Sequence, residues 1–314
     1  MALAMNVFKR SIEENIQDYL PREYEDAEIY FSEIRKNNIQ ATGLIVKLPD
    51  RQAAPIINLD MFYRDFIDGT DIENIYNEIA SLVQRGYREA PDYSGFDITD
   101  YKNNISMTFV NAKNNREMIA NMPHRMVNDL AVIYRVNLPG TEKNEASVPV
   151  TYDLMEFLGY ETREQLEEQA VKYMKENDPP VIKTMREMLI EMDPSFADFL
   201  PEEAEDPMYV ITNRSKCNGA VSVLDKETMD SLVDRIGSDL TILPSSVNEM
   251  IAIPKDMMEG KEALNMVKQV NETAVEDKDK LADSIYSYSK EKGFVQEKIK
   301  EDMEKDIDGK DMEM

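Results

Sequence analysis

A chain of 314 residues, 42% of them hydrophobic, is long and apolar enough to form one large globular domain or two smaller ones. Its 62 acidic and 36 basic side chains give a formal net charge of -26, which disfavours direct binding to nucleic-acid phosphates or to an anionic membrane. The negative charge has two interpretations. It keeps an ordinary bacterial cytoplasmic protein soluble, or it forms an acidic surface that binds a basic protein partner. A special case of the second is an acidic surface that imitates nucleic acid.

The first 137 residues are predicted to form helices and strands in alternation. Apolar residues at helical spacing predict a helix over 2–20, which Pro21 ends. Two strands follow, with a turn at Asn37 and Asn38 that makes them a hairpin. Asn58 and Asp71 are typical helix N-caps, and each precedes a run with one apolar face. The ranges are 27–34 and 41–48 for the hairpin, 59–66 and 72–83 for the helices, then strands 105–110 and 130–136 around a short helix at 114–121.

Residues 138–147 combine Pro, Gly and polar residues between apolar stretches, so we expect an irregular connection there. Thr162 is a typical N-cap for a helix over 163–177, and Pro179 and Pro180 interrupt it before a second helix over 181–192. The remaining elements are strands at 208–212, 219–224 and 239–243, and helices at 226–236 and 261–275.

The predicted fold class is therefore α+β, with two mixed α/β halves joined by a largely helical segment and followed by an acidic C-terminal tail. The expected division is 1–140, 141–206, 207–290 and 291–314. Residues 272–314 hold 14 acidic residues, 8 Lys and no Arg, so the last part is expected to be an exposed helix fraying into a flexible tail.

Several kinds of chemistry are excluded by what the sequence lacks. His124 is the only histidine, which excludes His-rich zinc and non-haem iron sites within one chain. Cys217 is the only cysteine, which excludes an intramolecular disulfide and a thiolate zinc cluster and is typical of a reducing compartment. No phosphate-binding glycine motif is present, so we predict no cofactor. No apolar run is long enough to span a bilayer, which predicts a cytoplasmic protein with no membrane partner.

Polar residues gather in three stretches that are candidates for a binding site. The stretch 242–254, "ILPSSVNEMIAIP", has at Ser246 and Glu249 the spacing of a capping box, which predicts the start of a local structure. Its alternative is a binding site that acts through hydrogen bonds. The candidate residues are His124, Arg125 and Asp129 in "MPHRMVNDL", Asn213 in "NRSKCNG", and Ser245, Ser246, Asn248 and Glu249.

The same stretches carry a resemblance that covers about residues 10–290. The chain resembles a family of unknown function in gut Clostridia such as Lachnospiraceae, often encoded near mobile or phage-derived genes. In the first half, "PIINLDMFY" (55–63) and "PHRMVNDLAVIYR" (123–135) are similar to its patterns P-x-I-x-L-x-x-x-Y and P-H-x-x-x-x-D-L-A-V-x-Y-R. In the second half the similar stretches are "PMYVITNRSKCNGA" (207–220), "LPSSVNE" (243–249), "MVKQVNET" (266–273) and "LADSIY" (281–286).

The resemblance implies a His where this chain has Asn248, within Pro-Ser-Ser-x-His-Glu. An asparagine cannot act as the general base that a histidine could provide. Together with the acidic charge, the scarcity of His, Cys and Gly and the mobile-element setting that the resemblance implies, this favours a non-enzymatic interaction or regulatory protein, with no catalytic residue and a protein partner that is basic in one version. The alternative is an enzyme of unknown reaction, with a pocket formed by the Pro-His-Arg and Pro-Ser-Ser-x-Asn-Glu motifs.

Overall fold

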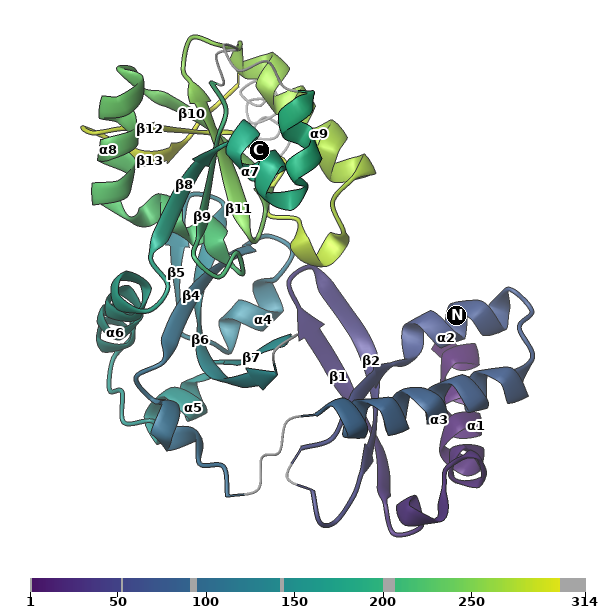
Figure 1. The fold of residues 1–314 in the computed structure, drawn as a ribbon. Helices are drawn as coiled ribbons and strands as arrows, with labels where there is room; N and C mark the ends of the chain where they lie inside the picture. Colours follow the sequence, from purple (N-terminus) through teal and green to yellow (C-terminus); the bar gives the residue numbers. More distant parts are fainter. Residues whose placement is uncertain (1, 52, 91–94, 142–143, 200–206, 300–314) are drawn as a thin grey trace, which may run out of the picture. The chain divides into compact units, whose positions relative to one another are not determined.

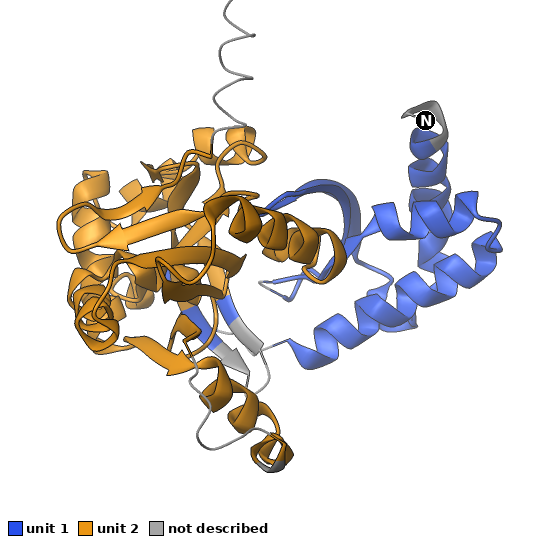
Figure 2. Ribbon diagram, turned by 90° about the horizontal axis from the view of Figure 1, so that it is seen from above, with its two compact units in different colours: residues 1–98, 138–146 blue, residues 99–137, 147–314 orange. Residues whose placement is uncertain are grey.

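The computed structural model describes residues 2–51, 53–90, 95–141, 144–199 and 207–299. Its fold is α+β, as predicted, and its sheets are antiparallel (Figure 1). The chain divides into two compact units (Figure 2): unit 1 holds residues 1–98 and 138–146, and unit 2 holds residues 99–137 and 147–314. In this division residues 99–137 group with the C-terminal part of the chain. No helix within the described ranges has the length and apolar content needed to cross a bilayer.

Unit 1 is a three-stranded antiparallel sheet of order β1-β2-β3 with helices on one face. Both predicted N-caps are confirmed, because the side chain of Asn58 accepts from Asp60 N–H and that of Asp71 from Glu73 N–H. The predicted turn is confirmed too, with Asn38 in the left-handed region at φ 57°. Its elements are α1 (Ala2–Asn15), η1 (Ile16–Tyr19), η2 (Arg22–Tyr24), β1 (Glu28–Lys36), β2 (Ile39–Lys47), β3 (Ile56–Asn58), α2 (Leu59–Ile67) and α3 (Ile72–Glu89).

The core of unit 1 lies between that sheet and the three helices. Leu44 on β2 pairs with Ile57 on β3, so their side chains point to the same face of the sheet. Both are buried against Phe8 of α1 and Ile79 of α3. The predicted apolar face of α3 is confirmed, because Ile75, Ile79 and Val83 lie in this core. The predicted face of α1 is right only in part, because Val7 is 66% exposed and Phe8 is buried in its place.

The first part of unit 2 holds most of a smaller sheet of order β4-β6-β5, in which β7 also pairs with β6; residues 138–146 of β6 and β7 are grouped with unit 1. The expectation of an irregular connection at 138–147 is wrong, because β6 continues through Pro139 and Gly140 and β7 returns along it. The strand β5, which holds His124, was not predicted at all. The elements of this part are η3 (Ile98–Tyr101), β4 (Ile105–Asn111), α4 (Arg116–Ala120), β5 (His124–Val127), β6 (Leu130–Thr141), β7 (Asn144–Pro149), α5 (Tyr152–Phe157) and α6 (Arg163–Glu176).

A six-stranded antiparallel sheet of order β13-β12-β10-β11-β9-β8 forms the rest of unit 2. Two elements differ from prediction: residues 180–184 are a strand and not the start of a helix, and residues 219–224 are a 3-10 helix and not a strand. The elements are β8 (Pro180–Thr184), α7 (Met185–Met192), η4 (Pro194–Asp198), β9 (Tyr209–Asn213), η5 (Gly219–Leu224), α8 (Lys226–Ile236), β10 (Leu240–Ser246), β11 (Glu249–Pro254), α9 (Gly260–Thr273), η6 (Asp277–Asp279), β12 (Tyr286–Ser289) and β13 (Gly293–Gln296).

Helices cover both faces of this larger sheet (Figure 1). On one face, Leu243 and Ile253 are buried against Val267 of α9. On the other, the hydroxyl of Tyr288 donates a hydrogen bond of 2.7 Å to Asp230 on α8. The predicted tail begins within this sheet, since β13 holds residues 293–296, and its part from residue 300 onward lies outside the described residues.

Candidate functional site

The loop between β9 and η5 is closed by the side chain of Asn213. Its Nδ2 donates to the carbonyl oxygen of Cys217 at 2.7 Å, and its Oδ1 accepts from the N–H of Cys217 at 3.2 Å. Nδ2 also donates to Asp178 at 2.7 Å, and the same carboxylate accepts from the N–H and the hydroxyl of Ser215, both at 2.9 Å. One amide and one carboxylate thus replace the backbone partners that this irregular segment lacks.

Two residues of this loop have a left-handed backbone although neither is glycine, namely Lys216 at φ 59° and Asn218 at φ 55°. The residue that follows, Gly219, has no room for a side chain. A Cβ atom there would lie 2.4 Å from the hydroxyl oxygen of Thr212 and 2.6 Å from the backbone nitrogen of Asn213. A glycine at position 219 is therefore required by the close approach of η5 to the end of β9.

Asn248 joins this loop to the turn between β10 and β11. Its Oδ1 accepts from the N–H of Asn218 at 2.9 Å, and its carbonyl oxygen accepts from the hydroxyl of Thr212 at 2.7 Å. The side chain of Asn218 in turn accepts from the hydroxyl of Thr108 on β4 at 3.0 Å. Two of the candidate residues, Asn213 and Asn248, therefore meet in one network, which also ties the two sheets of unit 2 together.

The predicted capping box at Ser246 and Glu249 is wrong. These two residues pair across a hairpin, with Val247 and Asn248 as its turn, and no helix starts there. The hydroxyl of Ser246 accepts from the N–H of Asn248 at 3.1 Å, and the hydroxyl of Ser245 donates to Glu249 at 3.2 Å. The stretch does build a local structure, but the structure is a β-hairpin.

Cys217 lies half-buried near a cation. The Nδ2 of Asn218 donates to its Sγ at 3.3 Å, and the nearby side chain of Arg135 interacts with it electrostatically. Burial lowers the pKa of the Arg135 guanidinium, and the cysteine acts in the opposite direction. The guanidinium is held by Ser147, whose hydroxyl and carbonyl oxygens accept from it at 2.8 and 3.0 Å.

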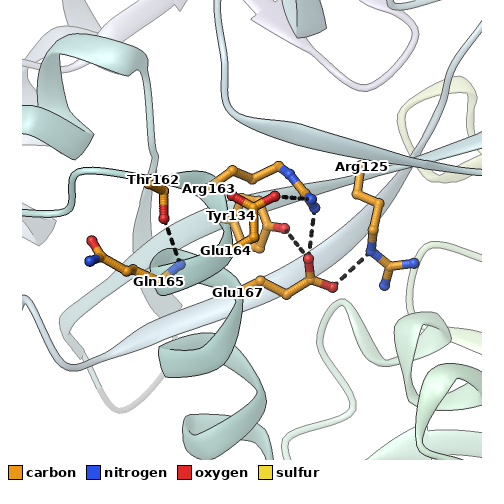
Figure 3. A network of polar contacts seen from close by, with 7 residues as sticks. All are labelled: Arg125, Tyr134, Thr162, Arg163, Glu164, Gln165 and Glu167. Atoms are coloured by element: carbon orange, nitrogen blue, oxygen red, sulfur yellow. Dashed lines mark hydrogen bonds and ion pairs between the residues drawn. The ribbon is translucent and has the colours of Figure 1, made fainter.

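Arg125 belongs to a different network, on the face of the smaller sheet that α6 covers (Figure 3). Its Nε and the Nη1 of Arg163 donate to the two oxygens of Glu167, each at 2.7 Å. The hydroxyl of the buried Tyr134 donates to the same carboxylate at 3.2 Å. Burial, followed by the charge of Glu167, raises the pKa of Tyr134 to about 12. The carboxylate is thus clamped by two guanidinium groups and a phenol, which fixes α6 on β5 and β6.

His124 and Asp129 lie at the two ends of the β5 strand and its turn. The Nδ1 of His124 is 2.9 Å from the carbonyl oxygen of Met122. Asp129 accepts three hydrogen bonds, from Ser284 at 2.6 Å, from Tyr286 at 2.7 Å and from Gln296 at 3.1 Å. Burial and the Asp129 charge raise the pKa of Tyr286. This cluster fixes the turn between β5 and β6 to β12 and β13.

The structure therefore distributes the candidates over separate networks. Within the described residues, no hydrogen bond or ion pair joins His124, Arg125 or Asp129 to the Asn213 and Asn248 network. Sequence reasoning missed the residues that complete these networks, which are Thr108, Arg135, Tyr134, Glu167, Asp178, Asn218 and Tyr286. Asn218 had a local signal, the Asn-Gly pair, and Glu167 is four residues from Arg163, whereas the other contacts of these residues join positions that are distant in sequence.

Two surface hollows of unit 2 contain none of the candidate residues. The first, about 570 Å³, lies around the β12–β13 hairpin and is lined by Lys255, Lys290 and Lys292 among others. The second, about 510 Å³, lies between the end of α6, β8 and the first turn of α8. Within the described ranges, no three His, Cys, Asp or Glu side chains are grouped so as to hold a metal ion.

Comparison with known proteins assigns the chain to a family but gives no function for it. Neither a curated protein nor a solved structure matches it. The model of one family, described as a family of unknown function, matches residues 5–290. This match includes both motifs and almost all of the described residues, and the chain belongs to that family, DUF5688.

Proposed function

We propose that this chain is a non-enzymatic interaction or regulatory factor of the bacterial cytoplasm that binds a basic protein partner. The mobile-element setting that the resemblance implies is part of this proposal. The proposal concerns binding through the protein surface.

The observation that supports it best is how the candidate side chains are used. Asp129 accepts three hydrogen bonds, and the amide of Asn213 uses both its oxygen and its nitrogen to close its own loop. Asn248 receives the N–H of a residue in the left-handed conformation. A general base needs an available lone pair within reach of a substrate proton. Asn213 and Asn248 instead hold the backbone of their loops, and the carboxylate of Asp129 accepts from three side chains.

The charge supports the second half of the proposal. A chain with a formal net charge of -26 attracts basic surfaces and speeds their association, and it repels nucleic acid and anionic lipid. Such attraction depends on ionic strength, because the Debye length falls from about 10 Å at 0.1 M salt to about 3 Å at 1 M.

The experiment is capture with the full chain from a lysate of its own source, at about 0.05 M and about 0.5 M salt, followed by isolation of the captured protein. We expect a stoichiometric basic protein whose dissociation constant, measured with the purified pair, rises steeply with salt. His124→Ala leaves this binding unchanged. The proposal fails if every stoichiometric partner is acidic or insensitive to salt, or if a substrate is turned over and His124→Ala abolishes the turnover.

A further inference from the structure

Strand β1 lies at one edge of the sheet of unit 1 (Figure 1). Its nine residues pair with β2 without a break in register, and it contains neither a proline nor a bulge. Within the described part of the chain, no strand pairs with its other side. A long, regular edge strand presents a row of N–H and C=O groups on which a further strand can pair.

The hydrogen bonds of β2 show which backbone groups of β1 face this free edge. The N–H of Thr42 donates to Asp60 at 3.2 Å, so it points away from β1. The carbonyl oxygen of Val46 accepts from Tyr87 at 2.7 Å and points the same way. In an antiparallel pair, two opposite residues turn their backbone groups either both inward or both outward, and the two arrangements alternate. The outward-facing residues of β1 are therefore Ile29, Phe31, Glu33 and Arg35.

The two faces of β1 are used differently. Ile29 and Phe31 pack on the core of unit 1, on the face that the helices cover. The alternate residues lie on the opposite face, where Tyr30 is 41% exposed. A Cβ atom added to Gly43 of β2 would lie 3.0 Å from the side chain of Ile34, which places this isoleucine on the same face as Tyr30. At the free edge this face therefore presents an aromatic and an aliphatic side chain.

The charges along β1 are self-complementary. Glu28 and Lys36 are exposed at its two ends, on the same face, and neither forms an ion pair within the described ranges. Between them, Glu33 and Arg35 neutralise each other in an ion pair of 2.7 Å. The hairpin 28–47 holds two acidic and three basic residues, so its net charge is +1 in a chain of -26. A second copy of the chain is therefore not repelled locally at this edge.

One antiparallel register of two β1 strands satisfies both the backbone and the charges. With Ser32 opposite Ser32 of the other copy, each outward-facing residue lies opposite another outward-facing residue, as a hydrogen-bonded ladder requires. Glu28 then lies opposite Lys36, and Tyr30 opposite Ile34, in the pairs whose side chains approach most closely.

The neighbouring registers are less favourable. A shift by two residues in one direction places Glu33 opposite Glu33 of the other copy, and like charges directly opposite are destabilising. A shift by two residues in the other direction leaves Arg35 and Lys36 beyond the end of the other strand.

We propose that β1 pairs antiparallel with β1 of a second copy of the chain, about a twofold axis at Ser32, and so joins the two three-stranded sheets into one continuous sheet. Such an interface is self-complementary, as twofold symmetry requires. The inference does not depend on the proposed binding of a basic protein. The two differ in their response to salt, because salt screens the repulsion between two chains of -26 and also screens the attraction of a basic partner.

The first measurement is the mass of the full chain by sedimentation at about 1 to about 100 µM, in about 0.05 M and about 0.5 M salt. We expect a dimer of twice 36.2 kDa whose dissociation constant falls as the salt concentration rises. Glu33→Pro removes an N–H that donates only in the dimer, and an edge strand tolerates proline where this group faces solvent. It is expected to raise the dissociation constant at least about tenfold, or about 1.4 kcal/mol.

The second measurement is an exchange of charges. Lys36→Glu places two carboxylates opposite each other at both ends of the paired strands and is expected to raise the dissociation constant about three- to tenfold. Glu28→Lys combined with Lys36→Glu restores opposite charges and returns the dissociation constant to within about twofold of wild type. The matched control is Lys113→Glu, which makes the same change of net charge at an exposed position of unit 2 and leaves the dissociation constant within about twofold.

Circular dichroism and urea unfolding establish that each variant is folded, and the charge variants decide if Glu33→Pro is not. The inference is overturned if the wild type is a monomer at every concentration and both salt concentrations. It is also overturned if Glu33→Pro dimerises as tightly as wild type, or if the exchange of charges does not recover what Lys36→Glu loses.

A monomer from which Glu33→Pro removes the binding of a basic protein uses this edge for a partner strand, so the inference fails and the proposed function stands. A dimer with these responses and no basic partner has the opposite meaning.

Discussion

Asn248 offers a direct test of whether the Pro-Ser-Ser-x-Asn-Glu motif supports the backbone. Its Oδ1 accepts the N–H of Asn218 at 2.9 Å, and residue 218 is held at φ 55°. The resemblance implies a histidine at this position, and the Nδ1 of an imidazole is as many bonds from Cβ as the Oδ1 of an asparagine. We therefore expect Asn248→His to keep the hydrogen bond when the imidazole is neutral, and Asn248→Ala to lose it.

The magnitudes follow from the burial of this contact. An unpaired polar group costs about 1–3 kcal/mol when buried, and position 248 is half-buried, so Asn248→Ala is expected to cost about 1 kcal/mol. A protonated Nδ1 cannot accept, so folding lowers the pKa of the introduced imidazole below the unfolded value of about 6.5. Below this pKa the unfolded state binds more protons than the folded state. The stability that the hydrogen bond of the introduced histidine contributes is therefore fully present above about pH 6.5 and is lost as the pH falls below that value.

The assay is urea unfolding of wild type, Asn248→Ala and Asn248→His at about pH 5 and about pH 8. Wild type at each pH corrects for His124 and every other titrating group. We expect Asn248→His to lie within about 1 kcal/mol of wild type at the higher pH and to lose about 1 kcal/mol more at the lower one. The reasoning is refuted if Asn248→Ala is as stable as wild type, or if the difference between Asn248→His and wild type does not change with pH.

Three further predictions concern stability measured by urea unfolding. Gly219→Ala is expected to cost about 3 kcal/mol, because its Cβ would lie 2.6 Å from the backbone nitrogen of Asn213. Gly260→Ala is expected to cost less than about 1 kcal/mol, because its Cβ would meet only the terminal Cδ1 atoms of Ile299 and Ile285, at 2.8 and 3.6 Å, and equal costs would contradict this. Asp129→Ala leaves two hydroxyls and an amide without their acceptor and is expected to cost about 3 kcal/mol, and an unchanged midpoint would argue against the cluster. Since the pKa of Tyr134 is raised from 10.0 to about 12, the folded state keeps a proton that the unfolded state has lost, so stability falls as the pH rises from about 10 to about 12. Tyr134→Phe is expected to make that fall smaller than in wild type, while the raised pKa values of Tyr286 and Tyr288 maintain the rest, and an equal fall in both proteins would contradict this.

Elements with their own local signals could be predicted from the sequence. Asn58, Asp71 and Thr162 each cap the helix that was placed after them, because a cap needs only its own side chain and the N–H groups of the next turn. The hairpin around Asn38 was predicted for the same reason, since its turn is only a few residues long.

Elements that depend on distant partners could not be predicted. Residues 180–184 become a strand because they pair with β9, about thirty residues later in the chain. Residues 219–224 have the composition of a strand, but Gly219 lies so close to Thr212 and the end of β9 that the chain turns into a 3-10 helix there. The networks at Glu167 and Asp129 could not be predicted for the same reason. Each joins strands of the small sheet to a helix or a hairpin from another part of the sequence.

The spacing of Ser246 and Glu249 shows how pairing decides between two local structures. In a capping box the serine hydroxyl accepts a hydrogen bond from the N–H three residues later. The hydroxyl of Ser246 instead accepts from the N–H of Asn248, two residues later, which suits a tight turn. The two strands that flank this turn are largely buried, residues 240–244 throughout and residues 250–253 for the most part. They pair with each other in register within the six-stranded sheet. Strand pairing thus decides the structure, and in the resulting turn the side chain of Asn248 accepts a hydrogen bond from the N–H of residue 218. A capping box does form at Thr184 and Glu187, where an edge strand ends and the next helix leads to the exposed Met192.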